Sequence, residues 1–187
     1  KTLRSYSHAL SQGGPNDFYS NGDYWWPDPS KPDGLPYVQR DGQSNPNNFN
    51  AHRRCLTQLS EAIAVLGAAY EITHEERYAQ KAAELLRVFF LDPATRMNPS
   101  LNYAQAIPGR APGRGTGIID TLHLVEVPVA VAILQRSPGF PSGVLAGLQK
   151  WFRDYSDWML SSTNGHQEAA ARKDRKSTRL NSSHGII

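Results

Sequence analysis

Apolar side chains recur at three- and four-residue spacing in four stretches of this chain. That spacing is typical of an α-helix with one buried face. The stretches cover residues 56–70, 73–89, 118–135 and 142–159. The alternation of β-branched and polar residues that predicts strands is absent. The pattern therefore predicts an all-α protein.

Local signals set the expected helix ends. Thr73 and Glu76 have the spacing of a capping box, which predicts that Thr73 starts the second helix. Pro128 lies inside the third apolar stretch and predicts a bend there. Ser142 precedes the fourth stretch and is expected to cap its helix.

Two long segments rich in Gly, Pro and Asn, residues 14–49 and 95–117, separate the helices. Loops of this length in a compact helical domain are uncommon unless they are functional. Two of them on one helical scaffold suggest a cleft at one end of a helical array. Helix hairpins arranged in a ring, an (α/α) toroid, would supply that geometry, and four helices make only part of one. The expected fold is thus an incomplete (α/α) toroid of helix hairpins with long functional loops.

The first of these loops carries three aromatic residues in a row, Tyr24, Trp25 and Trp26. Large aromatic side chains on loops either pack onto a core or hold a ligand. Because flat rings match the faces of pyranose sugars, the row favours a sugar-binding surface. A purely structural role is expected only if Trp25 and Trp26 are fully buried.

Several arginines accompany these aromatic residues. Arg40 and Arg53 lie close to them in the sequence, and Arg114 lies in the second loop. A guanidinium group pairs with a carboxylate through two parallel hydrogen bonds, so the combination suits an acidic polysaccharide. A plainer alternative is that Arg40 and Arg53 pair with neighbouring aspartates and that the tryptophans anchor the loop. For any single residue both interpretations stay open, and the whole set favours the functional one.

The net charge of the chain depends on its last residues. The 187 residues suit one domain and carry a formal charge of +3. Residues 172–187 hold five of the 20 Lys and Arg and one of the 17 Asp and Glu, which leaves 15 basic and 16 acidic residues elsewhere. The body therefore gives no electrostatic reason to expect nucleic acid. No run of 18 or more apolar residues is present, so we expect no membrane partner.

Other functional motifs are absent or incomplete. The run GRAPGRGTG lacks the spacing and the lysine of a phosphate-binding loop, and we interpret it as a flexible loop. The six histidines and the single Cys55 lack metal-ligand spacing, so we predict neither a metal nor another cofactor. Paired carboxylates such as Asp17 and Asp23 are compatible with a glycosidase, which stays open because sequence gives no distance.

Four runs of the sequence resemble the alginate lyase domain family, in its branch with a tandem-tryptophan motif: GPNDFYSNGDYWWPDP, PYVQRDGQSNP, TRMNPSLNYAQAIPGR and GRGTGIIDT. The resemblance covers roughly residues 11–173. It implies an (α/α) toroid, a uronate polymer such as alginate as substrate, and a periplasmic or secreted location. The implied reaction is β-elimination, in which a base removes the C5 proton of a uronic acid and the 4-O-glycosidic bond breaks. Asn, His or Arg side chains would neutralise the carboxylate, so no metal is required.

The resemblance also implies the residues that contact substrate. Motif matching assigns substrate binding to Asp23, Tyr24, Trp25, Trp26, Arg40, His52, Arg53, Gln105 and Arg114. Tyr103 is the one residue here that we consider for proton transfer, and the catalytic residues are otherwise unassigned.

The sequence departs from the family after SSTNGHQEAAARK. Family members continue with an Asn-Asn-His-Gly motif that carries the neutralising Asn and the catalytic His. Here the chain reads DRKSTRLNSSHGII, and we assign no catalysis to His184. We therefore divide the chain into a truncated lyase-like domain, residues 1–173, and a non-native or disordered tail, residues 174–187.

Three expectations follow from this division. The chain is predicted to be an N-terminal portion of a lyase that lacks activity as written. The alternatives are a non-catalytic carbohydrate-binding module and a hydrolase on the same scaffold, which would be favoured if Asp17, Asp23 or Asp120 faced one another. Loss of the rest of a toroid is expected to expose Trp151, Phe152 and Tyr155.

Overall fold

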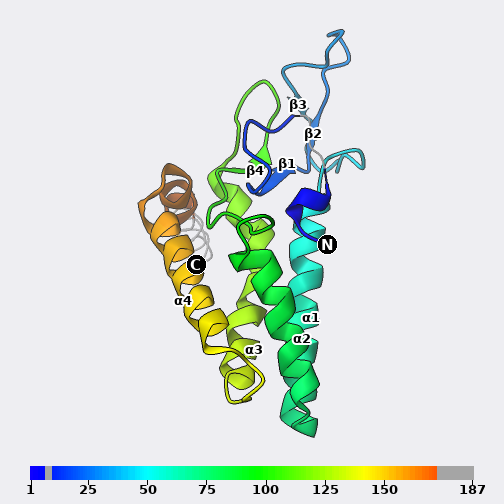
Figure 1. The fold of residues 1–187 in the computed structure, drawn as a ribbon. Coiled ribbons are helices and arrows are strands. Elements are labelled where there is room, and N and C mark those ends of the chain that lie inside the picture. The colour runs from blue at the N-terminus through cyan, green and yellow to red at the C-terminus, as the bar shows by residue number, and fades with distance from the viewer. Residues whose placement is uncertain (7–9, 172–187) are drawn as a thin grey trace, which may run out of the picture.

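Long helices run alongside one another in the computed structural model of the chain, which describes residues 1–6 and 10–171 (Figure 1). The elements are η1 (Leu3–Ser5), α1 (Ala51–Thr73), α2 (Glu76–Leu86) with the π-helical turn η2 (Arg87–Leu91), the 3-10 segment η3 (Gly115–Val125), α3 (Glu126–Leu134) and α4 (Ser142–Ser161). Residues 163–171 are also helical. Helices dominate the fold, as the hydrophobic spacing predicts.

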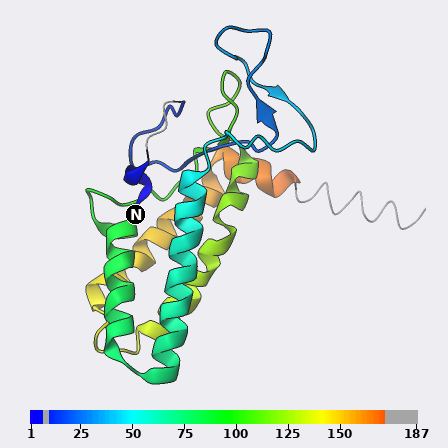
Figure 2. The same cartoon turned by 90° about the vertical axis from the view of Figure 1, so that its right-hand side faces the viewer.

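The helices form two antiparallel pairs, α1 with α2 and α3 with α4 (Figure 1). α1 and α3 lie against each other and run in the same direction, and each is followed by its antiparallel partner (Figure 2). The apolar spacing of α1 buries Leu56, Leu59 and Ile63. α3 contributes Val127 and Leu134 to the same core, both of them without exposed surface. Burial of these faces is the main stabilising contribution to the helical body.

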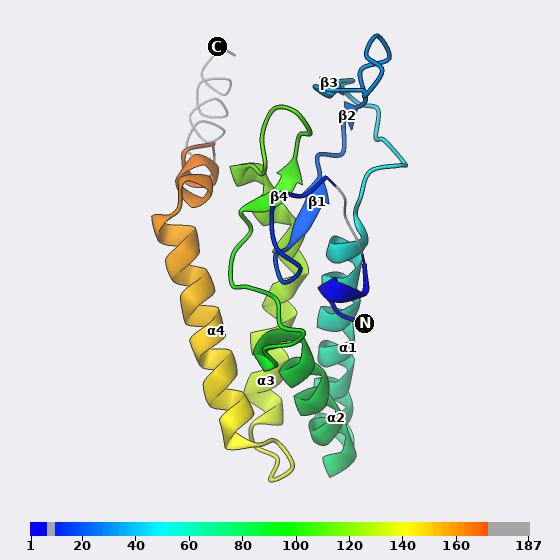
Figure 3. The same cartoon turned by 45° about the horizontal axis from the view of Figure 1, so that its top comes forward.

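Short strands, which the hydrophobic spacing does not predict, gather at one end of the mainly helical fold. β1 (Tyr19–Asn21) pairs in parallel with β4 (Tyr103–Ala106), and Figure 3 shows these strands side by side. β2 (Trp25–Trp26) pairs antiparallel with β3 (Val38–Gln39) in a hairpin that projects from that end (Figure 2). Strands of two to four residues are too short to show alternation in the sequence.

The capping predictions are wrong in detail. Thr73 ends α1, and Glu75 precedes α2, so no capping box forms between Thr73 and Glu76. The Glu76 carboxylate instead accepts a hydrogen bond of 2.7 Å from the backbone N–H of Gly139, in the loop before α4. Ser142 is the first helical residue of α4, and no side chain caps that helix.

The predicted bend at Pro128 is also misplaced. Pro128 lies in the first turn of α3, where the backbone N–H that proline lacks has no helical partner to lose. The interruption lies earlier, at Thr121, whose φ of −104° and ψ of 17° break the 3-10 segment η3.

The face expected to be exposed is buried. Trp151 and Tyr155 of α4 are 5% and 4% exposed, and their rings stack with centroids 5.4 Å apart. The indole N–H of Trp151 donates to the carbonyl of Met97 over 2.8 Å, and the Tyr155 hydroxyl shares a hydrogen bond of 2.8 Å with Thr121. Burial raises the pKa of Tyr155 to about 12. Phe152 alone of the three predicted residues is half-buried.

An apolar stripe on η3 and α3 is exposed instead, formed by Ile119, Leu122, Val125 and Val129. Residues Gly115–Leu134 are long and apolar enough to cross a membrane by length and composition, and 44% of an apolar 18-residue stretch within them is buried. Core helices of soluble proteins have the same length and composition, and this segment packs along α1 on its other face.

Candidate functional site

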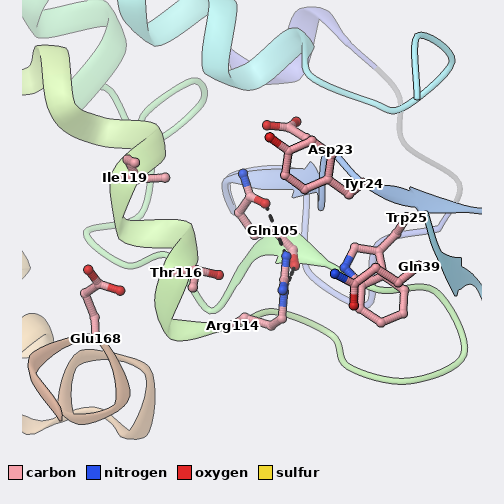
Figure 4. Close-up of a pocket in the computed structure, with 9 residues that line it drawn as sticks. All are labelled: Asp23, Tyr24, Trp25, Gln39, Gln105, Arg114, Thr116, Ile119 and Glu168. Atoms are coloured by element: carbon pink, nitrogen blue, oxygen red, sulfur yellow. Dashed lines mark hydrogen bonds between the residues drawn. The ribbon is translucent and has the colours of Figure 1, made fainter. Parts of the chain in front are cut away.

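A cleft of about 400 Å³ opens at the end of the molecule where the strands lie (Figure 4). β2, β3 and β4 each contribute to its wall, together with η3 and the helical residues 163–171. Its lining consists of Asp23, Tyr24, Trp25, Gln39, Gln105, Arg114, Thr116, Ile119 and Glu168. Segments far apart in the chain therefore meet at one polar site.

The tandem tryptophans point to different places because successive residues of a strand face opposite sides. Trp25 lines the cleft, with the guanidinium groups of Arg110 and Arg114 at 5.6 and 6.0 Å from its ring centroid. Trp26 does not line it. Its indole N–H donates to the carbonyl of Gln43 over 2.9 Å, and Arg40 stacks on its ring at 4.9 Å.

Arg114 is the basic group of the cleft wall. Its Nε donates to the backbone carbonyl of Gln105 over 2.7 Å, and its Nη2 lies 3.3 Å from the side-chain oxygen of the same residue. Among the described residues, no carboxylate lies within ion-pair distance of it. Burial lowers the pKa of Arg114, and the nearby charges of Asp120 and Asp23 partly offset that effect.

Gln105 holds Arg114 from an unusual backbone conformation. Its φ is 52°, in the left-handed region that a side chain other than glycine seldom adopts. The backbone N–H of Gln105 donates to Ser20 Oγ over 2.8 Å, and its side-chain Nε2 donates to Asp120 Oδ1 over 2.9 Å. Such conformations persist where the surroundings fix them, as these hydrogen bonds do.

Asp120 lies beneath the cleft with a side chain that is 1% exposed. Ser20 donates a hydrogen bond to its Oδ2, and Arg53 Nε lies 3.0 Å from its Oδ1, near enough for an ion pair although not aligned for a hydrogen bond. Burial raises the pKa of Asp120, and the charge of Arg53 partly opposes that shift.

Arg53 joins two aspartates. Its two terminal nitrogens donate to Asp23 over 3.3 and 3.2 Å, while its Nε faces Asp120. Burial by itself lowers the pKa of Arg53, but Asp120 and Asp23 together raise it above the ordinary value. Asp23 and Asp120 thus neutralise one guanidinium group and do not face each other across the cleft. Asp17 accepts hydrogen bonds from Gly14 and Asn98 in another loop.

Two glycines allow the close approach of these segments. A Cβ atom on Gly22 would lie 2.6 Å from Arg114 Nη2 and 2.7 Å from Trp25 Cδ1. A Cβ atom on Gly117 would lie 2.5 Å from the Cβ of Ala104. The run GRAPGRGTG, interpreted above as a flexible loop, thus ends at a glycine, Gly117, that close packing requires.

The structure gathers about half of the predicted binding residues. Asp23, Tyr24, Trp25, Gln105 and Arg114 line the cleft. Arg53 lies directly behind Asp23, where it serves as the ion-pair partner that the plainer interpretation expected.

The other predicted residues lie elsewhere. His52 is 0% exposed: its Nδ1 accepts from the Tyr19 N–H over 3.0 Å, which leaves the Nε2–H to donate to the Leu3 carbonyl over 3.1 Å. It is a core histidine, and its assignment to substrate binding is corrected. Tyr103 does not line the cleft either, and its ring packs against Gly13. Trp26 and Arg40 lie on the outer side of the hairpin.

Sequence reasoning missed several residues of the site. Gln39, Thr116, Ile119 and Glu168 line the cleft. Gln39 belongs to the run PYVQRDGQSNP, and Thr116 and Ile119 belong to GRGTGIIDT, so the resemblance offered a signal for all three. Glu168 lies in SSTNGHQEAAARK, the last segment before the sequence departs from the family. Asp120 was weighed only as a hydrolase carboxylate, and its contacts with Ser20, Gln105 and Arg53 depend on chain segments that meet only in the fold.

Metal coordination finds no support in the described part of the chain. Residues 1–6 and 10–171 contain no group of three or more His, Cys, Asp or Glu side chains arranged to hold an ion. The tail, with His184, lies outside the described residues.

Comparison with known proteins points to one family. The sequence profile of the alginate lyase family matches residues 2–176. Among solved structures, the crystal structure of an alginate lyase from Bacteroides ovatus is 41% identical, with a TM-score of 0.81 over 90% of this chain and 45% of that one. The chain thus spans less than half the length of that protein. A search of curated proteins finds no match.

Proposed function

Because the chain belongs to the alginate lyase family, we propose that it is the substrate-gripping part of a polysaccharide lyase acting on alginate or a related uronate polymer. One observation carries the proposal: a half-buried arginine, Arg114, faces a cleft without a carboxylate partner among the described residues. A cation that is partly desolvated and unpaired is ready to pair with an anionic ligand.

The geometry around Arg114 fits the carboxylate of a uronic acid. Its Nε and Nη2 face Gln105, and Nη1 makes no hydrogen bond with any described residue. The ring of Trp25 stands beside it and offers a flat surface to a pyranose ring. One sugar unit would thus meet a charge and an aromatic face together, which favours a charged polysaccharide over a neutral one.

β-Elimination requires two further groups. A base must take the C5 proton, and donors must stabilise the negative charge that develops on the carboxylate. Arg114 offers a donor for that carboxylate, and Tyr24 supplies a phenol to the described cleft wall. No histidine is among the described residues that line it. We propose that this chain binds the polymer and does not cleave it.

The helix pairs support a toroidal arrangement. α1 and α3 are parallel and adjacent, and each has an antiparallel partner, as in rings built of helix hairpins. The chain covers 45% of its structural neighbour, so we propose that it forms an incomplete (α/α) toroid. A polymeric uronate is encountered outside the cytoplasm, and we propose a periplasmic or secreted location for the protein.

Calorimetry and an elimination assay together test the proposal. Isothermal titration with a short oligouronate should show binding that weakens as salt is added, because ion pairs are screened. A neutral oligosaccharide of the same length should bind far more weakly. Equal affinity for both would refute the assignment to acidic polymers.

The elimination assay follows the ultraviolet absorbance of the unsaturated sugar that β-elimination creates. The 187-residue chain should give no such product from alginate. Turnover of alginate by the purified chain would overturn the prediction that it is inactive.

A second candidate is a non-catalytic carbohydrate-binding module, favoured by the same absence of histidine from the described cleft wall. Extending the chain with the family's Asn-Asn-His-Gly segment distinguishes the two: a lyase portion gains activity and a binding module does not. The two-carboxylate hydrolase is not favoured, because Asp23 and Asp120 both hold Arg53.

A further inference from the structure

A single buried carboxylate, that of Asp120, connects the segments that form the cleft. We propose that Asp120 is the positioning residue of this site: it holds Gln105, and through it Arg114, in the orientation that receives a uronate. The ligand named in this inference rests on the proposed function. The positioning itself does not, because it concerns the unliganded protein.

The contacts of Asp120 come from three other elements. Its Oδ2 accepts a hydrogen bond from Ser20 of β1. Its Oδ1 accepts one of 2.9 Å from the Nε2 of Gln105 on β4, and the same oxygen lies 3.0 Å from the Nε of Arg53 on α1. With its side chain 1% exposed, the carboxylate is reached by protein groups and not by the ligand.

The first consequence concerns Gln105. Its left-handed backbone is strained for a side chain other than glycine and persists only where the surroundings enforce it. Asp120 fixes the side-chain amide, and Ser20, which itself binds Asp120, fixes the backbone N–H. Both oxygens of Gln105 are thereby turned toward Arg114, at 2.7 Å from Nε and 3.3 Å from Nη2. The orientation of Arg114 therefore depends on Asp120, although the two residues are not an ion pair.

The second consequence concerns the aromatic wall. Asp120 shares the guanidinium of Arg53 with Asp23, which immediately precedes Tyr24 and Trp25. Arg53 is thus held between a buried and a half-exposed carboxylate and connects β2 to the start of α1. One carboxylate thereby supports both the cation and the aromatic ring that we assign to ligand binding.

A buried aspartate is a costly way to stabilise a fold, because ionic groups lose their hydration. Asp17 provides the comparison: it also accepts two hydrogen bonds, from Gly14 at 2.8 Å and Asn98 at 2.7 Å, but lies away from the cleft. If Asp120 served stability alone, its replacement, like that of Asp17, would leave the orientation of Arg114 and the affinity of the folded protein unchanged. The two replacements would then differ only in how much stability they remove.

The test compares Asp120→Ala and Asp120→Asn with Asp17→Ala in the whole chain. The first readout, without ligand, is the NMR correlation of the Arg114 Nε–H, identified by its loss in Arg114→Lys. Its slow exchange with water reports the bond to Gln105. The second readout is the dissociation constant for a short oligouronate, measured by calorimetry at equal folded fraction.

We expect Asp120→Ala to speed exchange of the Arg114 Nε–H and to weaken oligouronate binding by about 10-fold or more, as for a lost hydrogen bond to a charged group. Asp120→Asn should show smaller changes in Nε–H exchange and in affinity than Asp120→Ala, since its amide oxygen still accepts a hydrogen bond from Gln105. Asp17→Ala should change neither readout by more than about twofold.

Unchanged Nε–H exchange and unchanged affinity in folded Asp120→Ala would overturn the inference. If that variant does not fold, Asp120→Asn decides by the same two readouts. If the unmodified chain binds no oligouronate, the proposed function fails, and the exchange of the Nε–H alone then supports or overturns the positioning role of Asp120.

Discussion

Trp25 and Trp26 are neighbours in sequence and in strand β2, yet their environments differ. Trp25 belongs to the cleft wall with Arg110 and Arg114 beside its ring. Trp26 donates its N–H to Gln43 on the other side of the hairpin and carries Arg40 on its ring. Both are half-buried, so neither is the fully buried anchor of a purely structural loop. A motif shared by two residues thus does not assign them one role, because a strand sends successive side chains to opposite faces.

Residues of one chemical type also differ in whether they line the cleft. Arg114 is half-buried, held by Gln105, and lacks a carboxylate partner among the described residues, whereas Arg40 is exposed and stacked on Trp26. His52 was predicted to contact substrate, yet it is enclosed in the core. We therefore expect substitutions at the cleft to weaken binding, and substitutions of enclosed residues such as His52 to lower stability.

The largest expected effect is on stability, in His52→Leu. The substitution leaves the Tyr19 N–H and the Leu3 carbonyl without their buried partner and should lower the free energy of unfolding by about 2–4 kcal/mol. Urea denaturation measures this loss. Oligouronate affinity of the folded fraction should stay the same, and a selective loss of affinity would restore His52 to the binding site.

Next in size is the effect of Arg114→Gln on binding. Removing the charge should weaken oligouronate binding by about 10- to 100-fold, the range for a hydrogen bond between charged groups. Arg40→Gln is the matched control and should change the affinity by less than about threefold, because exposed charges contribute little. Titration calorimetry compares the two, and equal losses would abolish the distinction between the two faces of the hairpin.

Gly22→Ala tests whether Arg114 and Trp25 can pack at the cleft only when the residue between them lacks a side chain. The added Cβ would clash with Arg114 and Trp25, and we expect a stability loss of about 1–3 kcal/mol together with weaker binding. Gly143→Ala is the control, since a Cβ there meets nothing within 4 Å and alanine favours the helix. Thermal unfolding compares the stability of the two variants. An unaltered melting temperature in Gly22→Ala would show that the cleft wall rearranges freely.

The smallest expected effect separates the tryptophans themselves. Trp25→Ala should weaken oligouronate binding by about 3- to 10-fold through the loss of an aromatic face. Trp26→Ala should weaken it by less than about twofold, since its ring lies outside the cleft. Calorimetry at constant salt makes the comparison, and a larger loss for Trp26 would move the binding surface to the outer side of the hairpin.

Sequence predicts a site residue when its chemistry is unusual for its local segment, and it does not predict one whose role depends on contacts with distant segments. The aromatic row and the arginines of the loops placed Trp25 and Arg114 correctly in one group, because their chemistry is uncommon for loops. His52 was misassigned because the motif match gives no burial. Asp120 received no role in the site because its partners Ser20 and Gln105 are 100 and 15 residues away in the chain. Such a network leaves no local periodicity to detect.

Local sequence is enough to predict the helical body of this protein, since apolar spacing commits each segment to a helix with one buried face. It also specifies which chemical groups are available at the loops. Which of these groups share the cleft depends on the folded chain, because β1 and β4 pair across a long stretch of chain and place Ser20, Gln105 and Asp120 together. Hydrogen bonds between distant segments form only when burial of the helix faces has brought those segments into contact.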